Sequence, residues 1–351
     1  MSQTELERLL AEIDEQPAVV ERLLGHQIGA VSDIAATIRQ RDASAFVLVA
    51  RGSSDNAAIY GRYLLEVCNR RLTSLAAPSA LTLYGRGPRL DRTVVIGVSQ
   101  SGQGEDVIAY LREARAQGAA TVAIVNDERS PLADSAEWVL ACMAGPELSV
   151  PATKTVTAQM TLLAMLSCLL EDPSSDAGAL RGLPPALAAA LEQRAVAARL
   201  ARRLASTTVG SVIGRGFAFP PALEIALKLK ETSYTRAEPF SAADFLHGPV
   251  ALVEPEYSAV LVDVGGRSSD AAADIAGAIR ERGGQPVLVR AGDVRPLGQD
   301  WPHVSLETPL AEPFAPIVAL VLGQLLAVEL ALALGLDPAR PRGLRKVTST
   351  R

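Results

Sequence analysis

One arrangement of residues occurs twice in this 351-residue chain, about 165 positions apart. In each copy, a first apolar run ends at an arginine–glycine pair, and a second apolar run ends at a glycine- and serine-containing turn. A glycine then precedes a third apolar run. The matching segments are 49–52 and 213–216, 94–102 and 260–268, and 117–118 and 282–283. Three features in one order and at nearly one spacing predict a duplicated domain.

Within the first copy, apolar β-branched runs alternate with stretches rich in alanine and leucine. They predict strands at 46–50, 93–98, 120–125 and 138–142, and helices at 55–68, 104–117 and 155–171. Short apolar strands interleaved with helices are typical of a parallel sheet covered on both faces. We therefore expect an α/β fold of two tandem domains, each a parallel sheet flanked by helices.

Composition shifts divide the chain into five expected parts. They are an N-terminal helical segment at 1–30, a first domain at 31–172, a Pro- and Ala-rich helical connector at 173–198, a second domain at 199–336 and a C-terminal tail at 337–351. Ser2 and Glu5 predict a capping box for a short helix that ends before Pro17.

Charge and hydropathy limit the partners of the chain. The net charge is −5, and no block of like charge predicts a nucleic-acid or membrane face. The N-terminus is acidic rather than basic, unlike a secretory signal. The longest apolar stretch, 314–336, contains Gln324 and Glu329 and predicts a buried helix. We expect a cytoplasmic protein without nucleic-acid or membrane partners.

Cysteine and histidine do not predict a metal site. The three cysteines, at 68, 142 and 168, have no CxxC spacing, and the three histidines, at 26, 247 and 303, form no HxH or HxxxH pair. Reduced core cysteines are the expectation in a cytoplasmic protein. We predict neither a metal nor a cofactor.

Two loops have residues suited to phosphate. Ser99, Gln100 and Ser101 lie between the strand at 93–98 and the helix at 104–117, where free N–H groups meet a positive helix end. Gly52, Ser53 and Ser54 follow another strand end of the same predicted sheet. Ligands of parallel sheets bind at these ends, so the two loops support each other. The alternative is an ordinary N-capping serine cluster.

Other candidates are charged groups in the second half of the chain. Glu224, Lys228 and Glu231 share one helical face among apolar residues, although a solvated Glu–Lys pair would have the same spacing. His247 precedes a Gly-Pro turn, and Lys346 belongs to a basic tail that could simply be frayed.

Taken together, these motifs resemble the sugar-isomerase (SIS) superfamily. The sequence is similar to the isomerase region of glutamine–fructose-6-phosphate aminotransferases, and closer still to stand-alone two-SIS proteins that include glucosamine-6-phosphate deaminases of the second type. The matching stretches run in family order from residue 9 to 348: LLAEIDEQP, ARGSSDNAA, VSQSG, SVPATKTVTAQM, GRGFAFPPALEIALKLKETSY, AEPFSAADFLHGP and DPARPRGLRKVT.

The resemblance implies roles for individual residues. The phosphate cradle would comprise Ser54, Ser99, Gln100 and Ser101, with Gly52, Ser53, Val150 and Ala152 beside the ligand. Glu231 matches the proton-transfer carboxylate, and His247 matches the ring-opening histidine, which the family supplies from the neighbouring subunit of a homodimer. Lys346 matches the lysine that forms a Schiff base with the keto carbon. Glu224 and Lys228 match residues that line the same site, and the tail would close over it.

Three departures bear on the substrate. Gly104 stands where the family usually has Thr or Ser, and Pro151 and Ala152 stand where the synthases have Ala and Ser. Met1 leads directly into the isomerase-like part, so we expect no glutamine-dependent synthesis from this chain alone.

The resemblance implies an aldose–ketose aminosugar-phosphate enzyme, foremost a glucosamine-6-phosphate deaminase that forms fructose 6-phosphate and ammonia. The alternatives are a fructosamine-phosphate deglycase, which would use the same proton shift, and a non-catalytic sugar-phosphate-binding regulator. A regulator would need no Schiff-base lysine, so Glu231, His247 and Lys346 together favour an enzyme.

Overall fold

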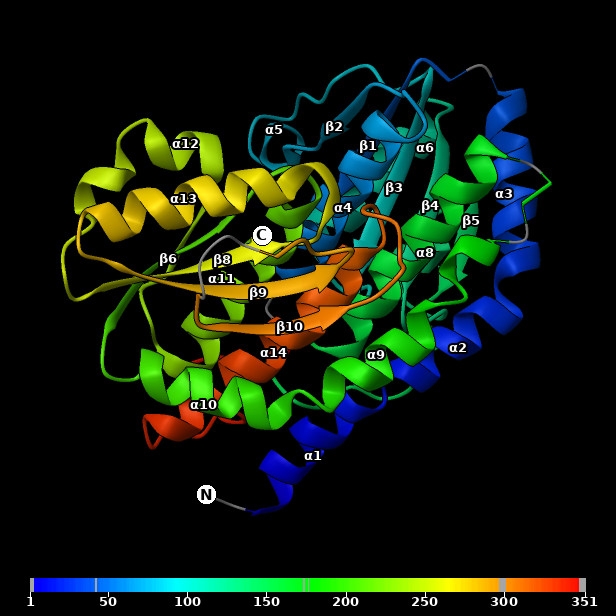
Figure 1. Cartoon of the computed structure of the whole chain (residues 1–351). Helices are drawn as coiled ribbons and strands as arrows, with labels where there is room; N and C mark the ends of the chain where they lie inside the picture. The colour runs from blue at the N-terminus through cyan, green and yellow to red at the C-terminus, as the bar shows by residue number, and fades with distance from the viewer. Residues whose placement is uncertain (1–2, 42, 173, 176, 297–300, 347–351) are drawn as a thin grey trace. The chain divides into compact units, whose positions relative to one another are not determined.

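The computed structural model describes residues 3–41, 43–172, 174–175, 177–296 and 301–346. The chain forms two compact units. The N-terminal unit comprises residues 18–147 and 154–181 and the tail from Arg345, and the C-terminal unit comprises the residues before Ala18, 148–153 and 182–344. Each unit has its own five-stranded sheet (Figure 1).

The sheet of the N-terminal unit is parallel throughout, in the order β2-β1-β3-β4-β5. Its strands are β1 (Ala45–Val49), β2 (Thr73–Leu75), β3 (Thr93–Ser99), β4 (Ala120–Val125) and β5 (Trp138–Ala141). The central strands are almost wholly buried, because helices cover both faces. The order reverses direction between β1 and β3, which pair with Val49 opposite Gly97.

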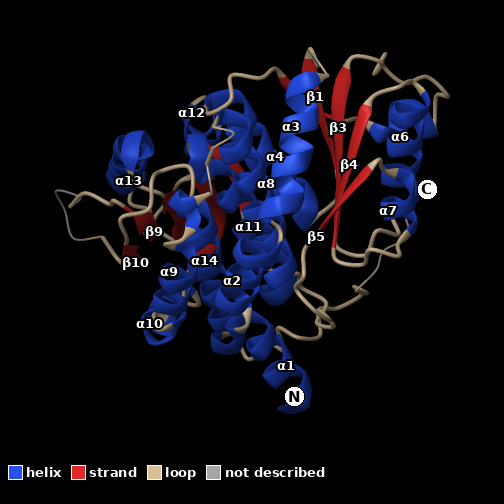
Figure 2. Cartoon of the chain, turned by 90° about the vertical axis from the view of Figure 1, so that its right-hand side faces the viewer, coloured by secondary structure: helices blue, strands red, loops and turns tan. Residues whose placement is uncertain are grey.

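Helices of the N-terminal unit form a layer on each side of this sheet (Figure 2). On one side, α6 (Glu105–Ala116) and α7 (Pro131–Ser135) share a core with Val47, Val95 and Ala123. On the other, α4 (Ser53–Val67) packs against α8 (Lys154–Glu171), where Gly61 leaves room for Leu163. The remaining helices are α2 (Gln16–His26), α3 (Ile28–Gln40) and α5 (Pro78–Thr82).

The C-terminal unit repeats this plan with the strand order β10-β9-β8-β6-β7, again all parallel. Its strands are β6 (Thr208–Gly214), β7 (Glu238–Ser241), β8 (Tyr257–Asp263), β9 (Gln285–Gly292) and β10 (His303–Glu307). Read from the other edge, the order matches that of the first sheet strand for strand. The predicted α/β fold with a duplicated parallel sheet is therefore confirmed.

Two helical layers also cover the second sheet. The helix α13 (Ser269–Glu281) packs on β8 and β9 from one face, with Ile275 and Ile279 in the core. On the other face, α10 (Arg194–Leu204) and α11 (Phe219–Ser233) pack against α14 (Ala315–Ala333) (Figure 1). The unit also contains α1 (Gln3–Asp14), α9 (Leu183–Leu191) and α12 (Ala242–Leu246).

The long apolar helix α14 is a core helix of its unit. It has the length and composition of a membrane span, but 89% of the apolar stretch is buried inside the protein. Its one buried polar residue, Gln324, accepts a hydrogen bond of 2.8 Å from Gln16 and donates one to the Thr153 carbonyl. These contacts satisfy the amide, as burial requires.

Differences from the predicted elements lie at the edges. The strands β2 and β10 and the four-residue β7 were not predicted, whereas the four strands predicted in the first copy agree to within one residue. The helix expected to end before Pro17 is α1, which ends at Asp14, and the proposed capping residue Ser2 lies outside the described residues. Residues 173–198 contain α9 and the start of α10.

Candidate active site

The two predicted phosphate loops lie at the reversal point of the first sheet. The loop at 50–53 follows β1, and the loop at 100–104 follows β3, the strand that pairs beside it (Figure 2). The crevice at the carboxyl ends of two strands whose connections diverge is the ordinary ligand site of an open parallel sheet. The structure therefore brings the two serine loops to a single edge of the N-terminal unit.

The loop after β3 is shaped by its own side chains. The Gly102 N–H donates to Ser99 Oγ at 3.0 Å, and the Gln103 N–H donates to Ser101 Oγ at 3.3 Å. Gly102 has a φ of +63°, and a Cβ there would lie 2.1 Å from Ser130 Oγ, so only glycine fits. The turn ends at Gly104, which begins α6 without a side-chain cap.

The loop after β1 begins the helix α4. Gly52, at a φ of +59°, precedes Ser53 and the buried Ser54, whose Oγ accepts a hydrogen bond of 3.0 Å from Gln159 of α8. Free N–H groups in the first turn of a helix attract anions. The N-terminus of α4 follows β1 and therefore lies at the same edge of the sheet as the loop after β3.

An ion pair that the sequence did not indicate joins the two loops. Arg51, two residues after the end of β1, lies 2.6 Å from the carboxylate of Asp106 in the first turn of α6. The carboxylate is 5% exposed, whereas the guanidinium side chain is half exposed. A carboxylate near a helix N-terminus and a paired arginine stabilise the spacing of the loops.

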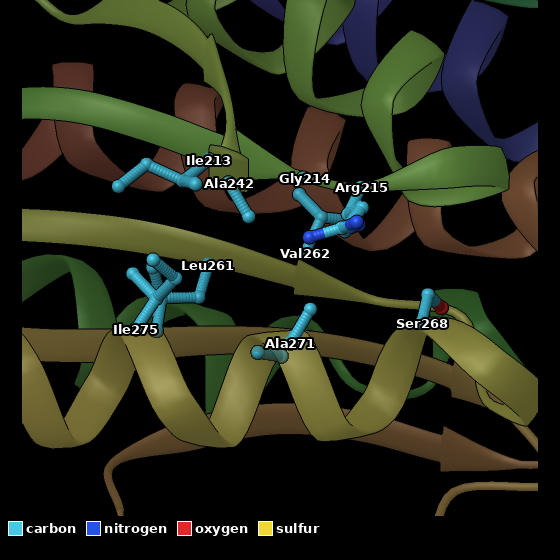
Figure 3. Close-up of a pocket in the computed structure, with 10 residues that line it drawn as sticks. Ile213, Gly214, Arg215, Ala242, Leu261, Val262, Ser268, Ala271 and Ile275 are labelled. Atoms are coloured by element: carbon cyan, nitrogen blue, oxygen red, sulfur yellow. The ribbon is translucent and has the colours of Figure 1, made fainter. Parts of the chain in front are cut away.

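The second copy of this loop is filled by carboxylates of its own unit. Asp263, wholly buried, accepts a hydrogen bond from the Gly265 N–H, and Glu312 accepts one from the Arg267 N–H. The adjoining cavity is lined mainly by apolar side chains such as Leu261 and Ile275 (Figure 3). Negatively charged carboxylates accept these amides in the second copy, whereas in the first copy the neutral hydroxyls of Ser99 and Ser101 accept two of them and still have protons to donate. The first copy is therefore the candidate cradle.

In the C-terminal unit, Glu224, Lys228 and Glu231 lie together on α11. The ammonium group of Lys228, 3% exposed, lies 3.3 Å from Glu224 and 2.5 Å from Glu231. Burial acts to lower the pKa of Lys228, but the two carboxylates outweigh it, and the pKa is raised. Of the three side chains, Glu231 is the most accessible, at 20% exposure.

His247 is not part of this cluster. It follows α12, and its side chain is exposed and makes no hydrogen bond or ion pair with any residue that the structure describes. Val150 lines a surface cavity with Ser149, Arg8 and Arg340, all of the C-terminal unit. Ala152, two residues further on, is half-buried.

Lys346 belongs to the N-terminal unit and is paired. Its Nζ lies 2.6 Å from the carboxylate of Glu147, whose side chain is fully buried. Sequence reasoning missed Glu147, which occurs in an unremarked stretch before the VPATK turn. Glu147 becomes a candidate site residue only because the folded chain brings it into contact with Lys346, which is 199 residues away in the sequence.

Comparisons with known proteins agree with this duplicated plan. The family model described as "SIS domain" matches residues 41–168 and 211–334. Glutamine–fructose-6-phosphate aminotransferase (isomerizing) of Thermus thermophilus is 34% identical over 96% of this chain. The alignment covers 58% of that protein, so the chain spans a little over half the length of this relative.

Solved structures show the same fold. A protein of Silicibacter pomeroyi described as a candidate phosphosugar isomerase superimposes with a TM-score of 0.84 and 33% identity, covering 94% of this chain and 99% of that one. The glucosamine-6-phosphate deaminase of Thermotoga maritima gives a TM-score of 0.77 at 19% identity, covering 98% of this chain and 100% of that one, which shows a shared fold. From the two matched segments and the two equivalent sheets, the chain belongs to the SIS-domain family and contains two SIS domains.

Proposed function

We propose that the chain is an aminosugar-phosphate aldose–ketose isomerase that releases ammonia, converting glucosamine 6-phosphate to fructose 6-phosphate. The phosphate would bind at the loops after β1 and β3, where free N–H groups and the Ser99 and Ser101 hydroxyls can donate to its oxygens. The names of the related proteins, a fructose-6-phosphate aminotransferase and a glucosamine-6-phosphate deaminase, support a substrate of this kind.

The buried cluster on α11 is the observation on which this proposal rests. Burying an ammonium group with two carboxylates stabilises a fold little, because desolvation offsets most of the attraction. A regulator that only binds a sugar phosphate needs no group that transfers protons. An isomerase needs a carboxylate that can take a proton from one carbon and return it to the next. Glu231, partly exposed and held by Lys228, fits that task.

The proposed reaction begins with opening of the sugar ring, assisted by His247. Glu231 removes the proton from the second carbon of the open aldose and delivers it to the first, which leaves an imine at the second carbon. Water hydrolyses this imine to the ketose and ammonia, and Lys346 assists by forming an imine of its own with the same carbon. A reaction on a sugar phosphate fits a cytoplasmic protein.

The decisive test is an ammonia-release assay with a panel of hexosamine phosphates and fructosamine-phosphate adducts. Glucosamine 6-phosphate should give ammonia and fructose 6-phosphate in equal amounts. The Glu231→Gln variant should lose about 10²–10⁴ in turnover, the usual value of a positioned acid–base group. Glu238→Gln, an exposed carboxylate of the same unit, should remain active.

Two other outcomes would contradict the proposed function and favour one of its alternatives. Ammonia or amine release only from fructosamine adducts would identify a deglycase. Binding of sugar phosphates without turnover, and without borohydride trapping of substrate on Lys346, would identify a regulator. With a catalytic Schiff base, borohydride should trap substrate on the intact chain and fail to do so on Lys346→Met.

A further inference from the structure

Glu147 is held at one point of the N-terminal unit by several contacts. Its carboxylate accepts hydrogen bonds from the Thr155 N–H at 3.0 Å and from Thr155 Oγ1 at 2.8 Å. Thr155 is the second residue of α8, whose positive end favours a negative charge. The Lys346 ammonium adds the ion pair of 2.6 Å. Both contacts from Thr155 remain if Lys346 leaves.

The lysine side of the pair is held much less firmly. Residues 334–346 form neither helix nor strand, and the Lys346 side chain is 20% exposed. Glu147, by contrast, is fully buried and anchored to an 18-residue helix. The pair therefore consists of a fixed carboxylate and a tail lysine that can dissociate from it.

We propose that Glu147 is the positioning residue for Lys346: it holds the amine on the N-terminal unit and accepts its proton when the amine reacts. The proton-accepting role rests on the proposed function, whereas the holding role rests on the contacts alone. An ammonium group has no electron pair for a carbonyl, so a lysine paired in this way must first lose a proton. The neighbouring carboxylate is the base in contact with it.

The step balances in atoms and charge. One proton passes from Lys346 Nζ to Glu147, and the freed electron pair of the amine forms a bond to the second carbon of the substrate imine. The substrate nitrogen takes one proton from Lys346 Nζ and one from Glu147 and leaves as ammonia. Lys346 Nζ retains one proton in the resulting protonated imine, and Glu147 is a carboxylate again.

The holding role is tested by limited trypsin digestion of the full chain without substrate, with fragments identified by mass. Glu147→Gln keeps the size and loses the charge. It can still contact Thr155, with its amide oxygen accepting from the N–H and its amide nitrogen donating to Oγ1. Cleavage after Arg345 and Lys346 should be faster by roughly tenfold or more, the effect of losing one hydrogen bond to a charged group. The matched control is Glu137→Gln, which removes an ion pair with Arg41 in the same unit and should leave tail cleavage unchanged.

A second variant, Lys346→Met, tests the same contact in case Glu147→Gln does not fold. Lys346→Met leaves Glu147 unchanged and removes only the ammonium group of its partner, so cleavage after Arg345 should accelerate to a similar extent. If neither variant changes tail cleavage, or if Glu137→Gln accelerates it equally, Glu147 does not hold the tail and the proposal is overturned.

The proton-accepting role is tested by kinetics on whichever substrate the ammonia assay identifies. Glu147→Gln should lower kcat about 10²-fold and leave KM within about twofold, and borohydride trapping on Lys346 should slow in parallel. Combining it with Lys346→Met should add no further loss. Normal kcat in Glu147→Gln would overturn this role. If the wild-type chain has no turnover but Glu147→Gln accelerates cleavage of the tail, the proposed function is contradicted. The holding role of Glu147 is then still supported.

Discussion

At the scale of single residues, the serines of the loop after β3 have two tasks. The oxygen atoms of Ser99 and Ser101 each accept an N–H of their own loop, which fixes the turn. Each hydroxyl still has a proton to donate, because a serine oxygen can accept and donate at once. The same side chains can therefore shape the loop and bind a phosphate oxygen.

Replacing both serines with alanine should weaken phosphate binding strongly. Each hydrogen bond to a charged group contributes roughly 1.5–3 kcal/mol, so KM for a sugar phosphate should rise at least tenfold. Isothermal titration with the substrate or inorganic phosphate gives the same comparison without turnover. Ser74→Ala, an exposed serine of the same unit, is the control. Unchanged affinity in the double variant would place the ligand elsewhere.

Lys228 is the residue whose loss should harm folding most directly. Lys228→Met leaves the buried Glu224 and the partly exposed Glu231 without their cation, at a cost of about 3–5 kcal/mol in the free energy of unfolding. Lys230→Met, an exposed lysine of the same helix, should change it little. Urea unfolding of the three proteins measures both differences.

The pH dependence of this stabilisation follows from the direction of the shift. Because the folded-state pKa of Lys228 is raised above its ordinary value of 10.5, its stabilisation is complete below that value. It is lost as pH rises from 10.5 through the folded-state pKa, where the unfolded chain has already released the proton. The difference between wild type and Lys228→Met should thus be constant from pH 7 to about pH 10 and shrink above it. A difference that shrinks between pH 7 and 9 would contradict the assignment.

At the scale of elements, the turn between β3 and α6 depends on two glycines with opposite constraints. Gly102 has a positive φ and no room for a Cβ, whereas Gly104 has a φ of −66° and its nearest neighbours would lie 3.6 Å from a Cβ. Gly102→Ala should therefore displace Ser130 or the loop. Gly104→Ser should fit and provide α6 with the side-chain cap that it lacks.

These two substitutions should act in opposite directions on stability and binding. Gly102→Ala should destabilise the protein by about 1–3 kcal/mol and raise KM for a sugar phosphate, because the backbone there is strained for any side chain. Gly104→Ser should stabilise it by a few tenths of a kcal/mol through N-capping and leave KM equal or lower. Thermal unfolding and steady-state kinetics test both. A tolerated Gly102→Ala would show that the loop is less constrained than its geometry indicates.

The elements also show what sequence patterns can and cannot predict. Inner strands such as β3 and β4 are continuous apolar runs, and the repeat at one offset identified the duplicated sheet. The edge strand β2 has three residues, and β7 contains Pro239, so neither has a recognisable pattern. The pairs Arg51–Asp106 and Glu147–Lys346 join residues far apart in the sequence. Only the folded chain reveals such contacts, because no local spacing encodes them.

At the scale of the whole molecule, the surroundings of His247 bear on the predicted homodimer. Its side chain is exposed and makes no polar contact within the described chain, and Leu246 and Leu252 beside it are 50% and 61% exposed. Large apolar side chains left exposed around a candidate catalytic group suit a surface that a second copy covers. The family resemblance implies the same arrangement, with His247 acting in the neighbouring subunit of a homodimer.

The dimer prediction can be tested by mixing two inactive variants. His247→Ala and Glu231→Gln subunits should each be inactive alone, because every site lacks one group. After equal mixing with subunit exchange, half of the dimers are mixed, and each mixed dimer has one site with both groups intact, so activity should recover to about one quarter of wild type. Mixing Glu231→Gln with Lys228→Met should restore nothing, since each site takes both residues from the α11 helix of a single chain and so always lacks one of them. Recovery in that control, or full activity in chains that sediment as monomers, would show that His247 does not act across subunits.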